Sequence, residues 1–512
     1  MTTDNIFVMT GDGDFVQNSG AKDRATQASI FGRVNYGYDN RYLATVTMRA
    51  DGSSKFGPQN KWGYFPSVAL AWRASQEKFL SNVSWLNNLK LRLGYGQVGN
   101  ANISTYLYGS AMQSYTTPLG TGYYLKNIPN PFLKWEASEQ FNAGIDFAAL
   151  NSRIELTVDV YKKQTKDLLL QMLIPTYLGG AEWNYLQAPY ANIGKTQNTG
   201  IDISLNTRNI ITKNFTWAST LTISHNKNKV VSLNDKSQIM YGNLDWWSEF
   251  QTATMIKVGQ PMGVFYGYKA DRLFTSEQDI LDSPVQVNDG NGRNRIDKVT
   301  GVYPGDIKFK DISGPDGVPD GVIDENDQVV IGDPNPDFTF GFTNNFSYRD
   351  FDLSIGLTGA VGGDVLNFAR YKTEAMNSIW DNQSVTVLNR ARAAIDASGA
   401  AYLSNPDAPL PRFSSLDGNR NNRMSDRWIE DGSYLRIQNI SLSYHIPSSL
   451  LQKAHIAAAK IYFNAQNVYT FTSYKGYDPE IGAFNQSALR QNIDMGRYPT
   501  PRTYTLGLNL TF

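Results

Sequence analysis

The last eleven residues, Arg502-Thr-Tyr-Thr-Leu-Gly-Leu-Asn-Leu-Thr-Phe512, alternate between two kinds of side chain. Every second residue from Tyr504 to Phe512 is large and apolar, and the residues between them are small or polar. A period of two is that of a β-strand, whose successive side chains point to opposite faces. Because the apolar face has no charge and the chain ends on an aromatic residue, we expect this strand to be paired to its last residue, as in an outer-membrane β-barrel. For this segment alone, the alternative is the edge strand of a soluble sandwich.

Composition favours a barrel in lipid over a membrane protein built from helices. Among the 512 residues no apolar run approaches the length of about 18 that a membrane helix needs, and the mean hydropathy is -0.39. The chain has 29 Tyr and 10 Trp, residues that favour the membrane–water boundary. It has no Cys, which suits a chain that crosses an oxidising periplasm unfolded. The formal net charge of zero gives no indication of a nucleic-acid partner.

The same alternation recurs along the whole chain. In the stretches 89–95, 154–160, 201–205 and 351–357 the apolar residues occupy one face and the charged or hydroxyl residues occupy the other. Apolar-out, polar-in patterning is typical of membrane barrels with a wet lumen. We therefore predict an all-β, transmembrane antiparallel β-barrel with strands at about 26–38, 41–51, 62–74, 88–98, 136–148, 153–165, 193–208, 215–227, 336–348, 351–360, 432–446, 457–468 and 502–512.

The predicted connectors alternate between short turns and long loops. Tight turns fall at 39–40, 149–152, 209–214 and 349–350, and the loops 99–135, 166–192, 228–335, 361–431 and 469–501 are long and rich in Gly, Pro, Asn and Asp. Short periplasmic turns and long extracellular loops are the asymmetry of outer-membrane barrels. The segment 262–274 is a candidate for one further strand. An odd number of strands cannot close a single-chain bacterial barrel, so these 13 to 15 strands are expected to be the C-terminal part of a larger one.

At this point several motifs resemble, in their order, those of the SusC/RagA-type TonB-dependent transporters of Bacteroidetes. The resemblance covers essentially all 512 residues, and the ordered set is more specific than any one motif. The motifs are Phe31-Gly-Arg-Val-Asn-Tyr36, Arg49-Ala-Asp-Gly-Ser-Ser-Lys-Phe56, Trp62-Gly-Tyr-Phe-Pro-Ser-Val-Ala-Leu-Ala-Trp72-Arg73, Leu91-Arg-Leu-Gly-Tyr-Gly96, Lys134-Trp-Glu136, Asn198-Thr-Gly200, Val258-Gly-Gln-Pro-Met-Gly-Val-Phe-Tyr-Gly-Tyr268, Pro336-Asp-Phe-Thr-Phe-Gly341, Asp431-Gly-Ser-Tyr-Leu-Arg-Ile437, Gln466-Asn467 and Gly476-Tyr-Asp-Pro-Glu480.

The resemblance implies a plugged barrel of 22 strands in the outer membrane, which imports oligosaccharides or peptides. It also implies a SusD-like surface lipoprotein as a lid, and energy coupling by TonB–ExbB–ExbD. We find no signal peptide, TonB box or plug in residues 1–512, which are therefore expected to be one partial barrel domain of a fragment, with coupling through the missing N-terminal part. No enzymatic activity is expected.

One segment has metal-ligand spacing. In Asp316-Gly-Val-Pro-Asp-Gly-Val-Ile-Asp-Glu-Asn-Asp327, four carboxylates fall at positions 1, 5, 9 and 12 of a calcium-binding EF-hand loop, with Gly321 at the glycine position. They are Asp316, Asp320, Asp324 and Asp327. Position 3 is Val318, which cannot ligate a metal. A calcium site and a plain acidic, turn-rich loop both remain open; no other cofactor is required, and Asp306 and Asp311 are further carboxylates nearby.

The other candidates for catalytic or ligand-binding residues are weaker. The three histidines, His225, His445 and His455, are isolated in the sequence and show no spacing typical of catalysis. The glycines at 362–363 do not follow a phosphate-loop pattern. The aromatic segments 183–185 and 244–250 have faces that could stack on sugars, although packing within loops is the simpler interpretation.

We therefore expect the membrane-spanning part of a nutrient importer. Its lumen-facing polar residues would hydrate and steer the substrate without reacting with it. Examples are Lys90, Arg92, Asp146, Glu155, Asp159, Asp202, Asp352 and Arg436. The alternatives are a passive porin of about 14 strands that closes on its own and a soluble surface glycan-binding β-protein.

Overall fold

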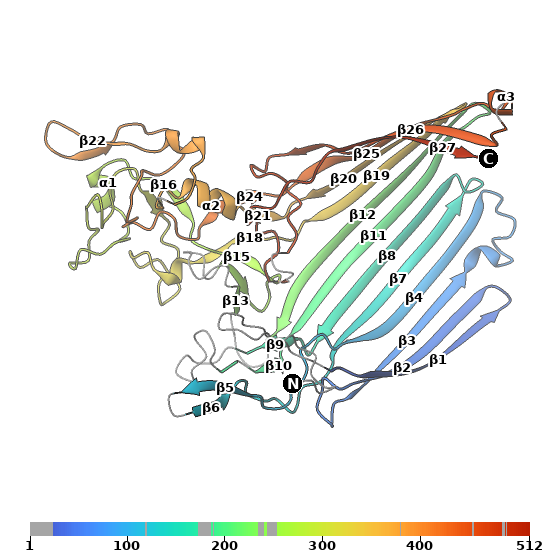
Figure 1. Cartoon of the computed structure of the whole chain (residues 1–512), viewed down its shortest axis with the longest axis horizontal. Coiled ribbons are helices and arrows are strands. Elements are labelled where there is room, and N and C mark those ends of the chain that lie inside the picture. The colour runs from blue at the N-terminus through green and yellow to red at the C-terminus, as the bar shows by residue number, and fades with distance from the viewer. Residues whose placement is uncertain are drawn as a thin grey trace.

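Thirteen antiparallel strands form one continuous sheet, which dominates the computed structural model (Figure 1). The model describes residues 24–512 except 118–119, 173–185, 188, 234–239, 243–252, 379, 453–454, 484–486 and 488. All thirteen strands predicted from the alternation are present, each close to its expected bounds. They are β1 (Gln27–Tyr38), β2 (Tyr42–Ser53), β3 (Trp62–Arg73), β4 (Leu86–Asn100), β7 (Glu136–Ala149), β8 (Ile154–Lys166), β11 (Lys195–Ile211), β12 (Phe215–Ser232), β19 (Phe338–Tyr348), β20 (Phe351–Val361), β25 (Tyr434–His445), β26 (Ala458–Thr472) and β27 (Thr503–Thr511).

The outward face of this sheet is apolar and exposed. Val46, Leu70, Leu93, Ile145 and Val160 are 45–50% exposed although they lie in the middle of paired strands. Aromatic side chains flank this aliphatic band at both strand ends, which is where the two membrane–water boundaries would fall. They include Tyr38, Tyr42, Tyr348 and Phe351 at the turn end, and Trp62, Tyr64, Tyr469 and Phe471 at the loop end.

The exposed apolar band distinguishes a membrane-embedded barrel from a soluble β-protein. A soluble sandwich or surface protein would bury its apolar face in a core, whereas an apolar band of this size needs lipid around it. The apolar face of the final strand, from Tyr504 to Phe512, is likewise exposed, while its backbone pairs with β26 as far as Thr511. The soluble alternative is therefore wrong. Within the residues that the structure describes, no α-helix has the length and apolar character needed to cross a bilayer.

The longest connectors all lie at one end of the strands. The connectors 39–41, 74–85, 150–153, 212–214, 349–350 and 446–457 lie at one end of the strands, together with the C-terminus. The described parts of the connectors 54–61, 101–135, 167–194, 233–337, 362–433 and 473–502 lie at the other end (Figure 1). Tight turns at the first end need a left-handed backbone, and Asp39, Asn40, Asn151 and Arg349 have φ between 49° and 59°.

The long connectors carry short elements of their own. In chain order these are β5 (Met112–Thr117), β6 (Gly120–Leu125), β9 (Leu169–Gln171), β10 (Tyr190–Asn192), β13 (Met240–Gly242), β14 (Thr254–Ile256), β15 (Val264–Gly267), β16 (Ala270–Leu273), α1 (Glu277–Leu281), β17 (Ile307–Phe309), β18 (Val329–Gly332), β21 (Asp364–Leu366), α2 (Phe368–Glu374), β22 (Ala393–Ile395), β23 (Ala401–Leu403) and β24 (Ile429–Asp431). At the turn end, α3 spans Ser448–Leu451. The candidate strand at 262–274 is present as β15 and β16, but these pair with β14, β18 and β17 above the barrel and do not join its wall.

Three long connectors fold into one unit, which we call the cap: the described residues of 233–337, 362–433 and 473–502. Its main core is built by residues from all three connectors, with Trp428 and Leu366 fully buried. The members are Ala253, Phe265, Leu366, Phe368, Tyr371, Ala375, Met424, Trp428 and Ile493. Backbone bonds from Leu366 to Asn492 and from Asp494 to Leu366, both 2.9 Å, join the last connector to the second. The cap is therefore a folded body above one side of the sheet (Figure 1).

The two edges of the sheet are β1 and β27. Each strand of the sheet runs opposite to its neighbour. Since β1 is the first and β27 is the thirteenth, these two strands run in the same direction. They cannot pair with each other in an antiparallel barrel. The thirteen observed strands therefore do not support the alternative of a porin that closes on its own.

Candidate functional site

An ion-paired cluster lies on the inner wall, opposite the apolar band. Arg92 on β4 donates from Nη2 to Oδ1 of Asp146 on β7 at 2.9 Å and to Oδ2 of Asp159 on β8 at 3.0 Å. The Lys90 ammonium lies 3.5 Å from Oδ2 of Asp146. Four of the eight charged residues predicted to face the lumen therefore meet in one cluster.

Gly144 allows this cluster to span three strands. In the sheet register Arg92 lies opposite Gly144, and Gly144 lies opposite Asp159. A Cβ at residue 144 would lie 2.3 Å from Oδ1 of Asp159 and 2.8 Å from Nη2 of Arg92. The absent side chain leaves the room through which Arg92 reaches across β7. Since alternation alone does not distinguish this glycine from any other small inward residue, the sequence did not single it out.

A groove of about 600 Å³ runs along the wall beside the cluster. Its inward residues are mostly small or hydrogen-bonding, and they include Thr45, Ser67, Gln140 and Asn142. The Arg92, Asp146 and Asp159 side chains keep 24–31% of their surface exposed, so water reaches these charges. Ion pairs of this kind are worth only about 0–1 kcal/mol, so they can exchange partners with a passing polar solute.

The other predicted lumen residues lie on the same face but apart from this cluster. Asp202, directly opposite Asp159 across the β8–β11 pair, accepts a hydrogen bond from Ser224 at 2.5 Å. Asp352 pairs with Nε2 of His445 at 2.7 Å near the turn end. Glu155 lies in the same inward row, opposite Ala148. These residues make the wall polar from end to end without forming a second cluster.

Arg436 forms a clamp where the wall meets the last long connector. Its guanidinium donates to Asp478 at 2.5 Å, to Glu480 at 2.8 Å and to Thr470 at 3.0 Å. Both Arg436 and Asp478 are buried, and Asp478 also accepts from Thr500 at 2.7 Å. Arg436 was expected to line the path, but it instead fixes the connector 473–502 to β25.

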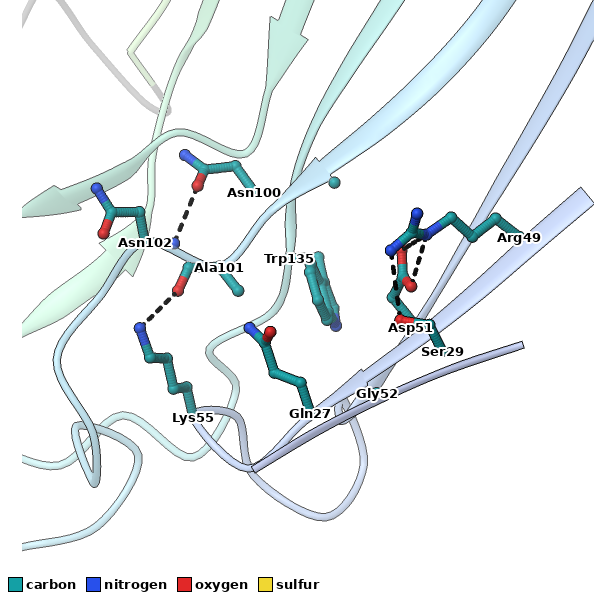
Figure 2. Close-up of a pocket in the computed structure, with 11 residues that line it drawn as sticks. Gln27, Ser29, Arg49, Asp51, Gly52, Lys55, Asn100, Ala101, Asn102 and Trp135 are labelled. Atoms are coloured by element: carbon teal, nitrogen blue, oxygen red, sulfur yellow. Dashed lines mark hydrogen bonds and ion pairs between the residues drawn. The ribbon is translucent and has the colours of Figure 1, made fainter. Parts of the chain in front are cut away.

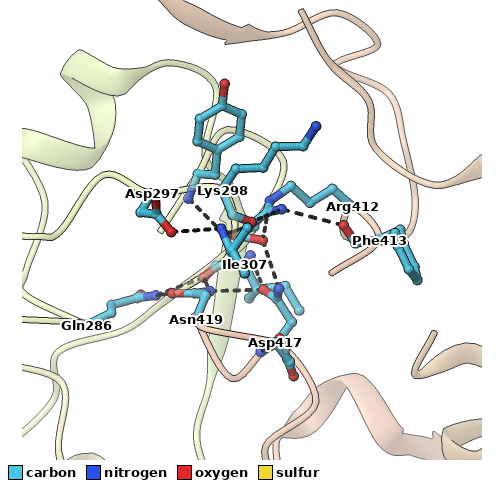
Figure 3. Close-up of polar contacts among 12 residues, drawn as sticks. Gln286, Asp297, Lys298, Ile307, Arg412, Phe413, Asp417 and Asn419 are labelled. Atoms are coloured by element: carbon cyan, nitrogen blue, oxygen red, sulfur yellow. Dashed lines mark hydrogen bonds and ion pairs between the residues drawn. The ribbon is translucent and has the colours of Figure 1, made fainter. Parts of the chain in front are cut away.

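A second buried network joins two connectors inside the cap (Figure 3). Asp306, which is fully buried, accepts from Arg412 at 3.0 Å, from Asn421 at 2.8 Å and from the Tyr303 backbone at 2.8 Å. Asn419 extends the network by donating to Ile307 O at 2.9 Å. Burial raises the pKa of the Asp306 carboxyl to about 6, and Arg412 and Asn421 partly offset that rise.

This network was not predicted as a unit from the sequence. Asp306 is one of the carboxylates near the acidic segment 316–327, but its side-chain partners lie more than 100 residues away on another connector. The three asparagines within residues 419–422 are the one local signal, because buried side-chain amides commonly hold loops by hydrogen bonds.

In the acidic segment 316–327, carboxylates accept hydrogen bonds from backbone amides. Asp327 is fully buried and accepts from the amides of Ile312 and Asp324 at 2.6 and 2.8 Å. Asp324 and Asp327 form a capping box around the short helical turn Glu325–Asp327. Asp320 accepts from its own loop at Val322, at 3.0 Å.

The geometry therefore favours the turn-rich alternative over the calcium site. The Gly321 amide is held by Asp311, whose other oxygen is buried without a hydrogen bond, and Asp316 is exposed. In the described part of the chain, no three His, Cys, Asp or Glu side chains are grouped closely enough to hold a metal. Calcium binding by Asp316, Asp320, Asp324 and Asp327 stays a prediction, which calorimetric titration with millimolar calcium tests.

The remaining candidates have structural surroundings or lie outside the described residues. Nδ1 of His225 contacts Asp337 O, His445 pairs with Asp352, and His455 lies in the turn-end connector after α3. Gly362 and Gly363 have φ of 73° and 83° and turn the chain away from β20. The aromatic segments 183–185 and 244–250 are outside the described residues.

A sheet with an apolar outer band, a polar ion-paired inner wall and all long connectors at one end defines an outer-membrane β-barrel of the transporter and receptor class. The chain belongs to the family described as "TonB dependent receptor-like, beta-barrel", whose model matches residues 2–468. Its relatives place it with the SusC/RagA type of that family, as the motif order predicted.

Three relatives illustrate this membership. TonB-dependent receptor P3 of Formosa agariphila is 33% identical over 505 residues, covering 97% of this chain and 46% of the relative. TonB-dependent receptor SusC of Bacteroides thetaiotaomicron is 32% identical over 506 residues, covering 96% and 44%. The solved RagAB peptide transporter superposes with a TM-score of 0.75 at 25% identity, covering 95% of this chain and 48% of that one. The chain thus spans less than half the length of these relatives.

Proposed function

We propose that this chain forms the barrel wall and the extracellular cap of a TonB-linked importer of oligosaccharides or peptides. The observation that carries the proposal is the inner wall around Arg92, where exchangeable ion pairs and the amide side chains of Gln140 and Asn142 border a groove. Such a wall can hydrate and guide a polar substrate that the apolar band would exclude. The proposal assigns the driving force to TonB–ExbB–ExbD and places no coupling residue within the 512 residues.

A SusD-like lipoprotein is the proposed partner on the cap. Three large apolar side chains of one cap segment, Trp380, Val385 and Leu388, are 89%, 80% and 65% exposed. Exposed apolar side chains on an extracellular loop are typical of a surface that a partner covers. Replacing Trp380 and Leu388 by Ser should reduce copurification of the lipoprotein with the intact transporter, while replacing the exposed Val318 by Ser should not.

Uptake in the native host tests the function. Deleting the gene should abolish growth on one class of oligosaccharide or peptide as sole carbon source, and the intact gene should restore growth only when TonB is present. Restoration without TonB would instead indicate a passive pore. Unchanged growth of the deletion strain on every tested oligosaccharide and peptide would contradict the importer proposal itself.

A further inference from the structure

A pocket of about 360 Å³ opens at the loop end of the first strands, away from both the wall cluster and the cap (Figure 2). We call it the rim pocket. It is formed by the loop ends of β1, β2 and β4 and by the residue that precedes β7. The lining residues that matter here are Gln27, Arg49, Asp51, Lys55, Asn100 and Trp135.

The Trp135 ring is a fixed wall of the rim pocket. Its indole N–H donates to Lys61 O at 3.1 Å, and its ring lies 5.2 Å from Phe56 and 5.6 Å from Phe65 between centroids. Phe56 is fully buried in a cluster with Ile103 and Leu133, so the ring is supported from behind. A half-buried, immobilised indole offers a flat apolar surface on which the C–H face of a sugar ring can stack.

The charges of the rim pocket leave one cation in excess. Arg49 Nε donates to both oxygens of Asp51 at 2.7 Å, so this pair is neutral. Lys55 donates to Ala101 O at 3.2 Å, and an ammonium has three donors, so within the described residues two remain for a ligand. In the view of Figure 2, Lys55 and Gln27 lie on one side of Trp135 and the Arg49–Asp51 pair lies on the other.

Glu136, which follows Trp135 in the sequence, makes its hydrogen bonds to other groups than Lys55. Glu136 accepts from Asn100 Nδ2 at 3.0 Å through one oxygen and from the Leu169 amide at 3.1 Å through the other. It does not line the rim pocket. An acceptor that enters the pocket therefore meets a half-buried ammonium, amide groups and an aromatic face.

We propose that the rim pocket binds one uronate ring of an acidic oligosaccharide, with the carboxylate on Lys55 and the ring stacked on Trp135. The proposal rests on the proposed import function and narrows its substrate class. A carboxylate matches Lys55 because charge-assisted hydrogen bonds are the strong ones. The volume lies at the lower end of the range for ligand pockets, which suits one ring and not a folded peptide.

Calorimetric titration of the purified full-length transporter tests the proposal. The probes are trimers of galacturonate and of mannuronate, the same trimers with every carboxyl methyl-esterified, and tetra-alanine. At least one acidic trimer should bind about tenfold or more tightly than its ester, since the ester keeps the ring and loses the charge. Lys55→Met should abolish that difference, and Trp135→Leu should weaken acid and ester alike.

Lys61→Met is the matched control, because Lys61 is an exposed neighbour that does not line the rim pocket. It should keep the preference for the acid. Equal binding of acid and ester, no binding of either acidic trimer at millimolar concentration, an equal loss in Lys61→Met, or Lys55-dependent binding of tetra-alanine alone would each overturn the proposal. If the importer function holds and only the pocket assignment fails, a Lys55→Met strain will still grow on the imported substrate while these titrations show no dependence on charge.

Discussion

The buried pair of Asp306 and Arg412 gives the sharpest prediction about stability. Arg412→Met keeps the aliphatic stem and removes the guanidinium, leaving Asp306 without its cation in a site where it is fully buried. The backbone oxygen of Lys298, which accepts from Arg412 at 2.8 Å, also loses its donor. Removing one partner of a buried ion pair costs about 3–5 kcal/mol. At pH 7 we therefore expect the cap to open locally about 150-fold to several thousand-fold more often.

Hydrogen exchange of the full-length protein measures this opening. The amides of Ile307 and Phe309 report directly, because they donate to Asn421 at 2.8 Å and to Gln286 at 2.6 Å within the same network. The variant that combines Asp306→Asn with Arg412→Met should exchange more slowly than Arg412→Met, since no unpaired charge remains. If Arg412→Met leaves these amides as protected as in the wild type, or the double variant is no better protected than the single one, the pair does not hold the cap together.

Four further outcomes follow from the same structure. Because the pKa of Asp306 is raised to about 6, its carboxyl contributes stability that is fully present below about pH 4 and lost as the pH rises through 6, so the cap amides should be better protected at pH 5 than at pH 7, and Asp306→Asn should remove that difference. Gly144→Ala should lower the temperature at which the barrel unfolds on gels, by disrupting the Arg92–Asp159 contact, whereas Gly32→Ala, with no atom within 4 Å of the new Cβ, should not; equal shifts would contradict the role of Gly144. Cysteine labelling of intact cells should reach Asn291→Cys in a long loop but not Asn151→Cys in a tight turn, with 99–135, 228–335 and 361–431 extracellular and 39–40, 149–152 and 349–350 periplasmic; the opposite labelling pattern would reverse the orientation. Behind a signal peptide, the 512 residues alone should give no heat-modifiable barrel, since β1 and β27 run in the same direction, and ion conduction in planar bilayers would refute this.

The barrel strands could be predicted because their signal is local. Alternation at a period of two and turn residues at short connectors can each be recognised within about ten residues of sequence. A shift of the strand register by one residue would turn every apolar side chain inward. The motif Gln466-Asn467 carries similar local information. Asn467 has a φ of 53° where β26 shifts register against β25, and Asn tolerates this backbone better than most residues.

The cap could not be predicted in the same way. Asp306 meets Arg412 and Asn421 across 106 and 115 residues, so no spacing in the sequence brings them together. The acidic segment shows that one spacing of carboxylates is compatible with two roles. Its spacing matches a calcium loop, but Asp324 and Asp327 satisfy backbone amides at the start of a helical turn, which the same residue types do equally well. The rim pocket could not be predicted from the sequence either, since Lys55 and Trp135 are 80 residues apart and belong to separate motifs.

The burial of the charged pairs divides the molecule into a part that can exchange partners and a part that holds its shape. On the inner wall the paired side chains of Arg92, Asp146 and Asp159 are 24–31% exposed, so breaking a pair costs little and a passing solute or another protein surface can replace one partner. In the cap, Arg412 and Asp306 are 6% and 0% exposed, and the same change leaves a charge buried. The Arg436 clamp, at 4% and 6% exposure with Asp478, joins the two parts. Under the proposed import function, a substrate can therefore rearrange the wall without loosening the connectors above it.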